Sequence, residues 1–143
     1  MKRFHFPLER VRRWRAGQAY VEELKLQTLF GQLASLAEEK AGVEKERAAS
    51  EQLVLEQASV EAAELQALDV YRGHSRTKIG GLEKRQLEVT AQIEQQRQRL
   101  MEARRQAELL ERFKTKMFGE WQAMADREEE TVAGELYLAK WRR

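Results

Sequence analysis

The sequence predicts an all-α fold, specifically a long two-helix antiparallel coiled-coil hairpin. Charged residues make up 35% of the 143 residues and the mean hydropathy is −0.73, so apolar side chains are too few for a deep globular core. The composition is rich in Ala, Leu, Glu, Gln, Lys and Arg, which is typical of extended helices. The single proline is Pro7, and no later residue blocks a helical hydrogen bond in this way.

The second half of the chain carries the strongest helical signal. Steps of three and four residues alternate strictly from Ile79 to Met124, and eleven of the fourteen positions are apolar. This repeat of 3.5 residues keeps one seam facing a partner helix and predicts a left-handed supercoil. The positions are Ile79, Leu82, Gln86, Val89, Ile93, Gln96, Leu100, Ala103, Ala107, Leu110, Lys114, Met117, Trp121 and Met124.

The first half shows the same seam over a shorter stretch. Apolar residues occupy it from Leu26 to Val43, with Lys40 as an interruption. Between about 44 and 64 the seam weakens, because polar residues stand where leucine is expected, and Leu65 and Leu68 then restore it. The polar positions are Arg47, Ser50, Gln57 and Glu61.

A cluster of glycines predicts where the chain reverses. Three of the eight glycines, Gly73, Gly80 and Gly81, lie within residues 71–81. We therefore expect a single coiled-coil domain over residues 1–143, with a first helix over about 8–70, a turn over about 71–81 and a second helix over about 82–138. Both termini would then meet at one end of the hairpin. One continuous helix that pairs with a second copy is the alternative.

Charge is segregated along the chain, and the segregation favours the hairpin. Residues 17–70 carry eleven acids and four bases, whereas residues 71–116 carry six acids and twelve bases. An acidic first arm and a basic second arm attract each other when the chain folds back. The support is modest, since an exposed ion pair contributes at most about 1 kcal/mol.

The residue inventory argues against an enzyme and against catalytic, cofactor or metal sites. There is no cysteine, and the two histidines, His5 and His74, fall at opposite ends of the predicted hairpin. The run Glu128–Glu130 is typical of a solvated helix face, and Gly80-Gly81 lacks the lysine of a phosphate-binding loop. No apolar run reaches the roughly 18 residues of a membrane span, and no secretory signal is recognisable, so we expect a cytoplasmic protein.

The two ends of the chain combine arginine with aromatic residues, the residue types that dominate protein-binding hot spots. Near the start lie the basic cluster Arg10, Arg12, Arg13 and Arg15 and the aromatic residues Phe4, Phe6 and Trp14, and at the finish lie Tyr137, Lys140, Trp141, Arg142 and Arg143. We expect them to form one protein-docking surface. The alternatives are helix packing with solvated charges, or contacts with nucleic acid, although no nucleic-acid module surrounds the cluster.

Two segments of the sequence resemble the flagellar FliJ family, small proteins of the flagellar type III export apparatus. The first is the opening, Phe4-His5-Phe6-Pro7-Leu8-Glu9-Arg10-Val11. The second lies near the end and comprises Leu110-Glu111-Arg112-Phe113-Lys114, Trp121, Asp126-Arg127-Glu128-Glu129 and Glu135-Leu136. Gly119 and Gly134 depart from the pattern, because a helix-forming residue is expected at both positions.

The resemblance implies a non-enzymatic function. Proteins of this family are similar to the central stalk of rotary ATPases: they insert into the hexameric ring of the export ATPase and contact the cytoplasmic domain of the export gate, and they also bind export chaperones. It further implies a monomer at the flagellar base that reaches the inner membrane only through its partners. The implied ring-docking residues are Phe4, Arg10, Arg13, Trp14, Arg127, Trp141 and Arg142, and the implied gate contacts are Tyr71, Ile79 and Leu82. A stalk of a virulence type III secretion system or a dimeric coiled-coil scaffold remains the alternative.

Overall fold

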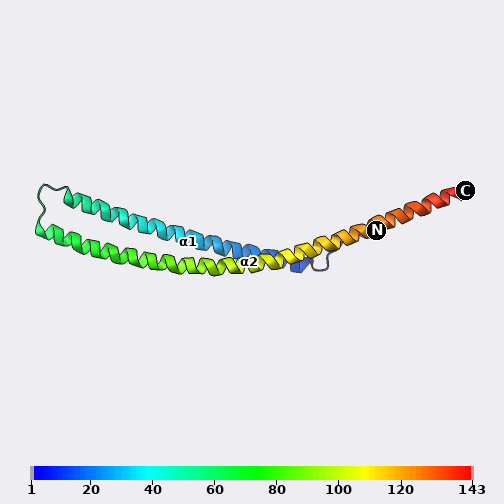
Figure 1. Cartoon of the computed structure of the whole chain (residues 1–143), viewed down its shortest axis with the longest axis horizontal. Helices are drawn as coiled ribbons and strands as arrows, with labels where there is room; N and C mark the ends of the chain where they lie inside the picture. The colour runs from blue at the N-terminus through cyan, green and yellow to red at the C-terminus, as the bar shows by residue number, and fades with distance from the viewer. Residues whose placement is uncertain (1, 143) are drawn as a thin grey trace. The chain divides into compact units, whose positions relative to one another are not determined.

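The computed structural model describes residues 2–142, and these residues form two long helices and no strand. Helix α1 spans Glu9–Leu55 and helix α2 spans Ala62–Trp141 (Figure 1). The helices pack against each other, which confirms the predicted all-α fold. The chain forms two compact units. Unit 1 combines the residues up to Val21 with those from Leu100 onward, and unit 2 spans Glu22–Arg99.

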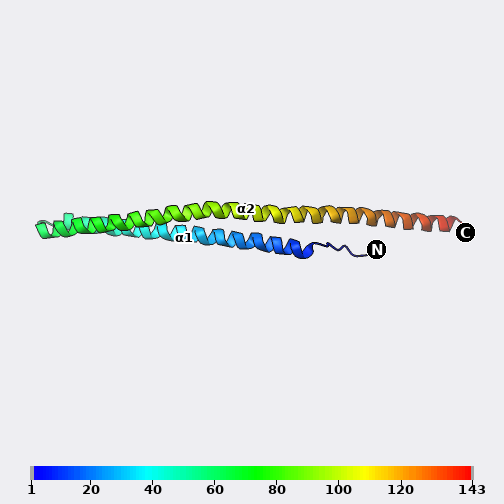
Figure 2. The same cartoon turned by 90° about the horizontal axis from the view of Figure 1, so that it is seen from below.

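In unit 2 the helices run antiparallel in a constant register. The Arg72 Nε atom donates to Glu51 Oε1 at 2.8 Å, and Lys40 Nζ lies 3.1 Å from Glu83 Oε1. The two ion pairs are eleven residues apart on α1, from Glu51 to Lys40, and eleven residues apart on α2, from Arg72 to Glu83. Neither helix therefore shifts along the other between the two pairs. Figures 1 and 2 both show the cyan part of α1 alongside the green part of α2.

The core of unit 2 is a thin apolar seam. Leu36, Val43 and Leu82 are each at most 8% exposed, and Ile79 and Val89 pack against them. All five occupy positions of the predicted repeat or its counterpart in α1. The antiparallel packing is therefore driven by the stripe that the heptad pattern places on one side of each helix.

The turn predicted at residues 71–81 is wrong, because these residues belong to α2. Gly73, Gly80 and Gly81 are exposed, and no glycine of the described chain has a positive φ. The seam also continues through this stretch in steps of four and three, from Leu68 through Arg72 to Ser75 and on to Ile79, with Leu68 6% and Ser75 3% exposed. A helical glycine costs roughly 1 kcal/mol relative to alanine, and the uninterrupted seam outweighs that cost.

The chain reverses instead at residues 56–61, which contain no glycine or proline. This connection lies inside the stretch 44–64 where the seam weakens, so α1 ends at Leu55 rather than near 70 and α2 begins at Ala62 rather than near 82. The first hydrogen bonds of α2 run from the backbone N–H groups of Glu64 and Leu65 to the Glu61 carbonyl, at 3.1 and 3.2 Å. The reversal is consequently earlier in the chain than predicted, and α2 has 80 residues against 47 in α1.

The predicted seam of α2 is confirmed from Ile79 to Trp121, where every position is buried or half-buried. The polar position Gln96 is only 5% exposed. Its Nε2 donates to the Glu22 backbone carbonyl at 3.0 Å and also to the Glu22 carboxylate, so the buried amide is satisfied. The last predicted position is wrong, since Met124 is 65% exposed.

Candidate protein-docking surfaces

Residues 2–8 precede α1 and lie along α2 in unit 1. Phe6 is 4% exposed, and its ring meets the Phe113 ring edge-on at 5.8 Å between centroids. Phe4 packs against Phe118 at 5.2 Å and against Trp121 at 5.8 Å. The Trp121 Nε1 also donates to the Lys2 carbonyl at 3.3 Å. These apolar and aromatic contacts fix the non-helical start of the chain to α2.

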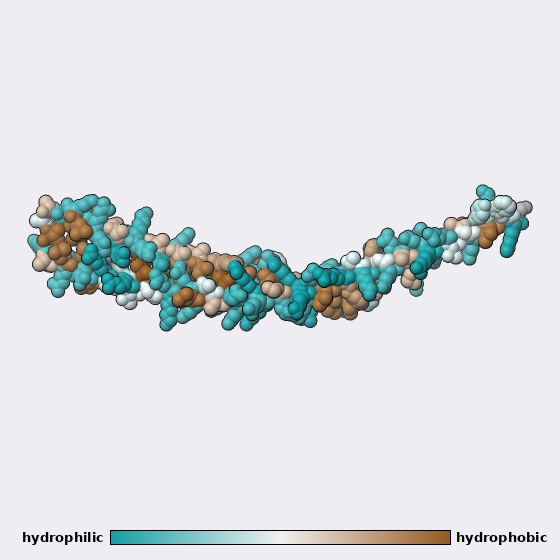
Figure 3. All heavy atoms as spheres, viewed as in Figure 1, coloured by the Kyte–Doolittle hydropathy of each residue, from teal (hydrophilic) through white to brown (hydrophobic). Residues whose placement is uncertain are grey.

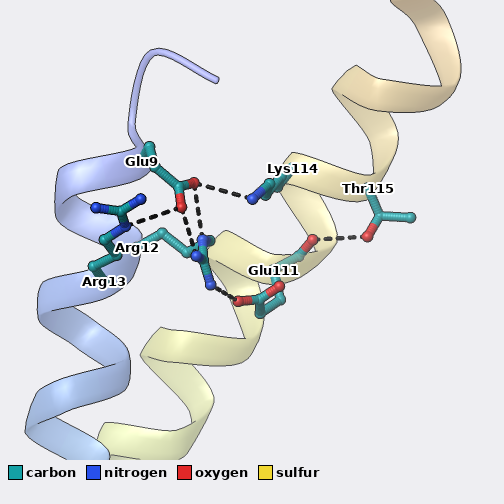
Figure 4. Close-up of polar contacts among 6 residues, drawn as sticks. All are labelled: Glu9, Arg12, Arg13, Glu111, Lys114 and Thr115. Atoms are coloured by element: carbon teal, nitrogen blue, oxygen red, sulfur yellow. Dashed lines mark hydrogen bonds and ion pairs between the residues drawn. The ribbon is translucent and has the colours of Figure 1, made fainter. Parts of the chain in front are cut away.

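A polar network follows directly, where α1 begins (Figure 4). Glu9 accepts hydrogen bonds from Arg12 at 2.5 and 2.9 Å, from Arg13 at 3.3 Å and from Lys114 at 3.1 Å. Arg12 also donates to Glu111 at 2.5 Å. The hydrogen bond from Arg12 is the main cause that lowers the pKa of Glu9 to about 2, and Lys114 adds to it. The network therefore joins the first turn of α1 to α2 through charged side chains, and an acid in that turn also favours the helix start.

Trp14 is an exposed aromatic residue of this region. It is 55% exposed, and the Arg15 guanidinium lies over its ring at 4.7 Å. Arg15 also donates to the Gln106 side chain on α2. Arg15, which is itself bonded to α2, thus holds the Trp14 indole in place. Much of the indole surface stays open to a partner protein.

Beyond Trp121, α2 continues without a partner helix. Figure 1 shows this part of unit 1 in orange and red. In the described chain, no hydrogen bond, ion pair or ring contact links residues 122–142 to α1 or to residues 2–8. We call residues 122–141 the unpaired segment. Its exposed apolar side chains are Met124, Val132, Leu136, Tyr137, Leu138 and Trp141.

The unpaired segment has an apolar stripe bordered by acids. A shallow hollow on it is lined by Ala125, Glu128, Glu129, Val132, Ala133 and Leu136. The ring of Trp141, 75% exposed, lies 6.3 Å from that of Tyr137 one turn earlier. An exposed stripe of this kind is suited to contact with another protein.

The prediction that residues from the two termini form one surface is wrong. Phe4 is half-buried against Phe118 and Trp121, whereas Trp141 follows Trp121 by twenty residues, about 30 Å along a helix. The physical reason is the early reversal of the chain: residues 2–8 already lie beside α2 between Phe113 and Trp121, and α2 extends twenty residues beyond that contact.

Apart from Phe4, which packs on α2, the predicted docking residues fall into two groups. Arg10, Arg13 and Trp14 are exposed on the first two turns of α1. Arg127, Trp141 and Arg142 are exposed on or just after the unpaired segment. Arg143 lies outside the described residues.

The residues predicted for the gate contact differ in accessibility. Leu82 is 5% exposed and Ile79 packs against the same apolar cluster, so both belong to the core of unit 2. Tyr71 is half-buried and lines an open groove beside the connection. Of the three side chains, Tyr71 is the one that lines this groove.

Sequence reasoning missed the exposed apolar residues of the unpaired segment, among them Val132, Leu136 and Leu138. A signal was present in the sequence. The three-four repeat from Ile79 stops at Met124, and the chain still has apolar residues after that point. Apolar residues outside a repeat that already has its partner are candidates for contacts with other molecules.

Across residues 2–142, no three or more His, Cys, Asp or Glu side chains are grouped in a way that would hold a metal ion. Within the same residues, neither helix contains a stretch apolar and long enough to cross a membrane. Comparisons with protein-family models, curated proteins and solved structures found no match to this chain.

Proposed function

We propose that this protein is a non-enzymatic stalk of the flagellar type III export apparatus, which inserts into the hexameric ring of the export ATPase and links it to the export gate. One observation carries the proposal. The two segments that resemble the FliJ family lie at opposite ends of the sequence, and in unit 1 they pack on each other through Phe6 with Phe113 and Glu9 with Lys114. The resemblance implies that both segments serve one role, and their contact in unit 1 supports that implication.

The unpaired segment is the part that we assign to the ring. It offers Arg127 and Trp141 along a single helix that no part of α1 pairs with, and Arg142 follows directly after that helix. A single helix is narrower than a pair, which suits insertion into the opening of a ring. Arg10, Arg13 and Trp14 lie where the pairing ends, and they would contact the rim of the ring while the unpaired segment is inside.

The remaining partners follow from the same assignment. The gate contact falls at Tyr71, the member of the three implied residues that lines the open groove, and export chaperones are further partners. In this role the protein is a cytoplasmic monomer, peripherally associated with the inner membrane through the export machinery. A stalk of a virulence type III secretion system would use the same chemistry, and the neighbouring genes distinguish the two.

A dimeric coiled-coil scaffold is the second candidate, and the exposed stripe of the unpaired segment favours it. Two copies would bury Val132, Leu136 and their neighbours against each other. The stripe is bordered by Glu128 and Glu129, however, and like charges would face each other across such a pair. Mass measurement at micromolar concentration separates the candidates: a monomer supports the stalk and a stable dimer supports the scaffold.

The test of the stalk is the ATPase turnover of the cognate export ATPase with and without the chain. We expect the whole chain to raise turnover and a chain that ends at Trp121 to leave it at the basal rate. Because the unpaired segment has no contact with α1, the shortened chain should keep its paired helices, and circular dichroism checks this.

Charge reversals sharpen the result. Arg10→Glu with Arg13→Glu should abolish the stimulation at unchanged helicity, whereas Lys84→Glu with Arg85→Glu, at exposed positions of unit 2, should leave it intact. Equal loss in both double variants would indicate a general effect of net charge and would reject the assignment. Steeply salt-dependent binding of duplex or single-stranded nucleic acid would point to the nucleic-acid alternative instead.

A further inference from the structure

The end of unit 2 that carries the connection has an unusual combination of charge and exposed apolar surface. We call residues 50–71 the loop end. Residues 51–70 contain five acids and no lysine or arginine. Four large apolar side chains of this stretch are between 49% and 70% exposed: Leu53, Leu55, Leu65 and Val70. Figure 3 shows the hydrophobic patch at this end of the molecule.

An open groove of about 320 Å³ lies between the last turns of α1 and the first turns of α2. Its apolar lining comes from Val54 on α1 and from Ala67, Leu68 and Tyr71 on α2, and Glu64 stands beside them. The remaining lining residues are Ser50 and Gln57. The groove has the character of an interface, with an apolar floor and a polar, acidic edge.

Local helix stability accounts for only part of the acidic charge. Glu61 and Glu64 lie at the start of α2, where negative charge favours the helix dipole. Glu56 follows the end of α1, where a lysine or arginine would be favoured and where the last turn contains no base. The Glu56 carboxylate has no ion pair in the described chain and accepts a hydrogen bond only from Gln52, at 2.9 Å. Its charge works against the helix that it follows.

We propose that the loop end docks a basic amphipathic helix of another protein. The apolar floor between two helices accepts side chains that recur every three or four residues on one face of a third helix. Glu64 at the groove and the other acids of the loop end, Glu56 above all, select lysine or arginine on the rest of that helix. The same negative charge disfavours binding to nucleic acid, to an anionic membrane and to the identical loop end of a second copy. The inference rests on exposure and charge, and it holds whether or not the protein is a stalk of the export apparatus.

The experiment uses the whole chain, labelled with ¹⁵N, and a fluorescent peptide of about 18 residues with leucines on one helical face and lysines elsewhere. We expect the peptide to shift the amide signals of residues 50–71, and a matching peptide with glutamates in place of the lysines to shift none. Signals that shift mainly in the unpaired segment, or equal binding of the glutamate peptide, would overturn the proposal.

Two variants separate docking from folding. Glu56→Lys should weaken peptide binding about tenfold while the melting temperature stays the same or rises, because the new charge suits the end of α1. Leu53→Ser, at a side chain 70% exposed, should weaken binding at unchanged helicity. The matched control is Glu129→Lys on the unpaired segment, which changes the net charge by the same amount as Glu56→Lys. Its peptide affinity should stay within about twofold of that of the original chain.

Two results would contradict the docking of a foreign helix. The first is an equal loss of binding in Glu56→Lys and Glu129→Lys, which would reduce the effect to net charge. The second is a dimer in mass measurements that Leu53→Ser converts to a monomer, which would assign the loop end to a second copy. Neither result depends on the ATPase assay. Rejection of the helix-docking proposal is therefore distinct from rejection of the proposed stalk function.

Discussion

Helix α2 contains two stretches whose leucine side chains have opposite environments. In the paired stretch, residues 79–121, the seam residue Leu100 is 5% exposed, whereas in the unpaired segment Leu136 is 66% exposed. Both lie in the same continuous helix. What differs is the partner, because α1 and residues 2–8 provide an opposite face as far as Trp121 and no further. Burial along α2 therefore ends where the opposite face ends, close to Met124, at which the three-four repeat of apolar positions also stops.

The largest expected effect compares the same substitution in the two stretches. Leu100→Ala should lower the free energy of unfolding by about 2–4 kcal/mol, because it removes a buried side chain and leaves a cavity. Leu136→Ala should change it by less than about 0.5 kcal/mol. Urea titration followed by circular dichroism measures both. Similar losses at the two positions would show that the unpaired segment is covered in solution.

A smaller effect is expected from the buried amide of the seam. Gln96→Ala removes the hydrogen bonds to Glu22 and should cost about 1 kcal/mol. The hydrogen bond from Gln96 is also the main cause that lowers the pKa of Glu22, so the pKa of this carboxyl should rise in the variant. Two-dimensional NMR across an acid titration follows the Glu22 signal. Gln122→Ala, one residue past Trp121, is the exposed control and should be neutral in both measurements.

Glycine substitutions test whether residues 71–81 are helical, as in the structure, or form the turn that the sequence predicted. A Cβ atom added at Gly81 would meet nothing within 4 Å, and Gly81 has no positive φ. Gly81→Ala should therefore stabilise the protein by about 0.5–1 kcal/mol. Gly134→Ala has the same open surroundings, but it lies in the unpaired segment and should raise helix content there without moving the midpoint of global unfolding. Destabilisation by Gly81→Ala would argue for a turn at residues 71–81.

The smallest effect concerns acid and the Glu9 network. The pKa of Glu9 is lowered in the folded protein from about 4.5 to about 2, so its contribution is present above pH 4.5 and is lost as the pH falls toward 2. The pH dependence of the unfolding midpoint should be flatter over this window in Glu9→Gln than in the original chain. Glu129→Gln on the unpaired segment should leave that dependence unchanged. If Glu9→Gln retains the full dependence, the network does not form in solution.

The sequence predicted the pairing well, because the seam from Ile79 to Trp121 is a long periodic signal that depends only on which residues are apolar. The reversal was misplaced for a physical reason. Gly73, Gly80 and Gly81 face solvent, where a glycine is tolerated in a helix, while the actual connection at 56–61 carries no glycine or proline. Its only signal was the polar seam at Gln57 and Glu61.

The candidate surfaces were predictable in residue type and not in placement. Arginine and aromatic residues near both termini indicated protein contacts, and Trp14 and Trp141 are indeed exposed. Phe4 packs within the protein, because its partners Phe118 and Trp121 lie more than 110 residues away in sequence and only the three-dimensional register brings them together. The docking roles remain predictions for the experiments above.

The continuity of α2 across Trp121 also affects how the unpaired segment forms. A separate helix has to form its own first turn, and that step is costly because several residues are fixed for one hydrogen bond. Here that nucleus already exists in the paired stretch, and residues 122–141 need only propagate from it. A binding partner would thus meet a helix that is already initiated.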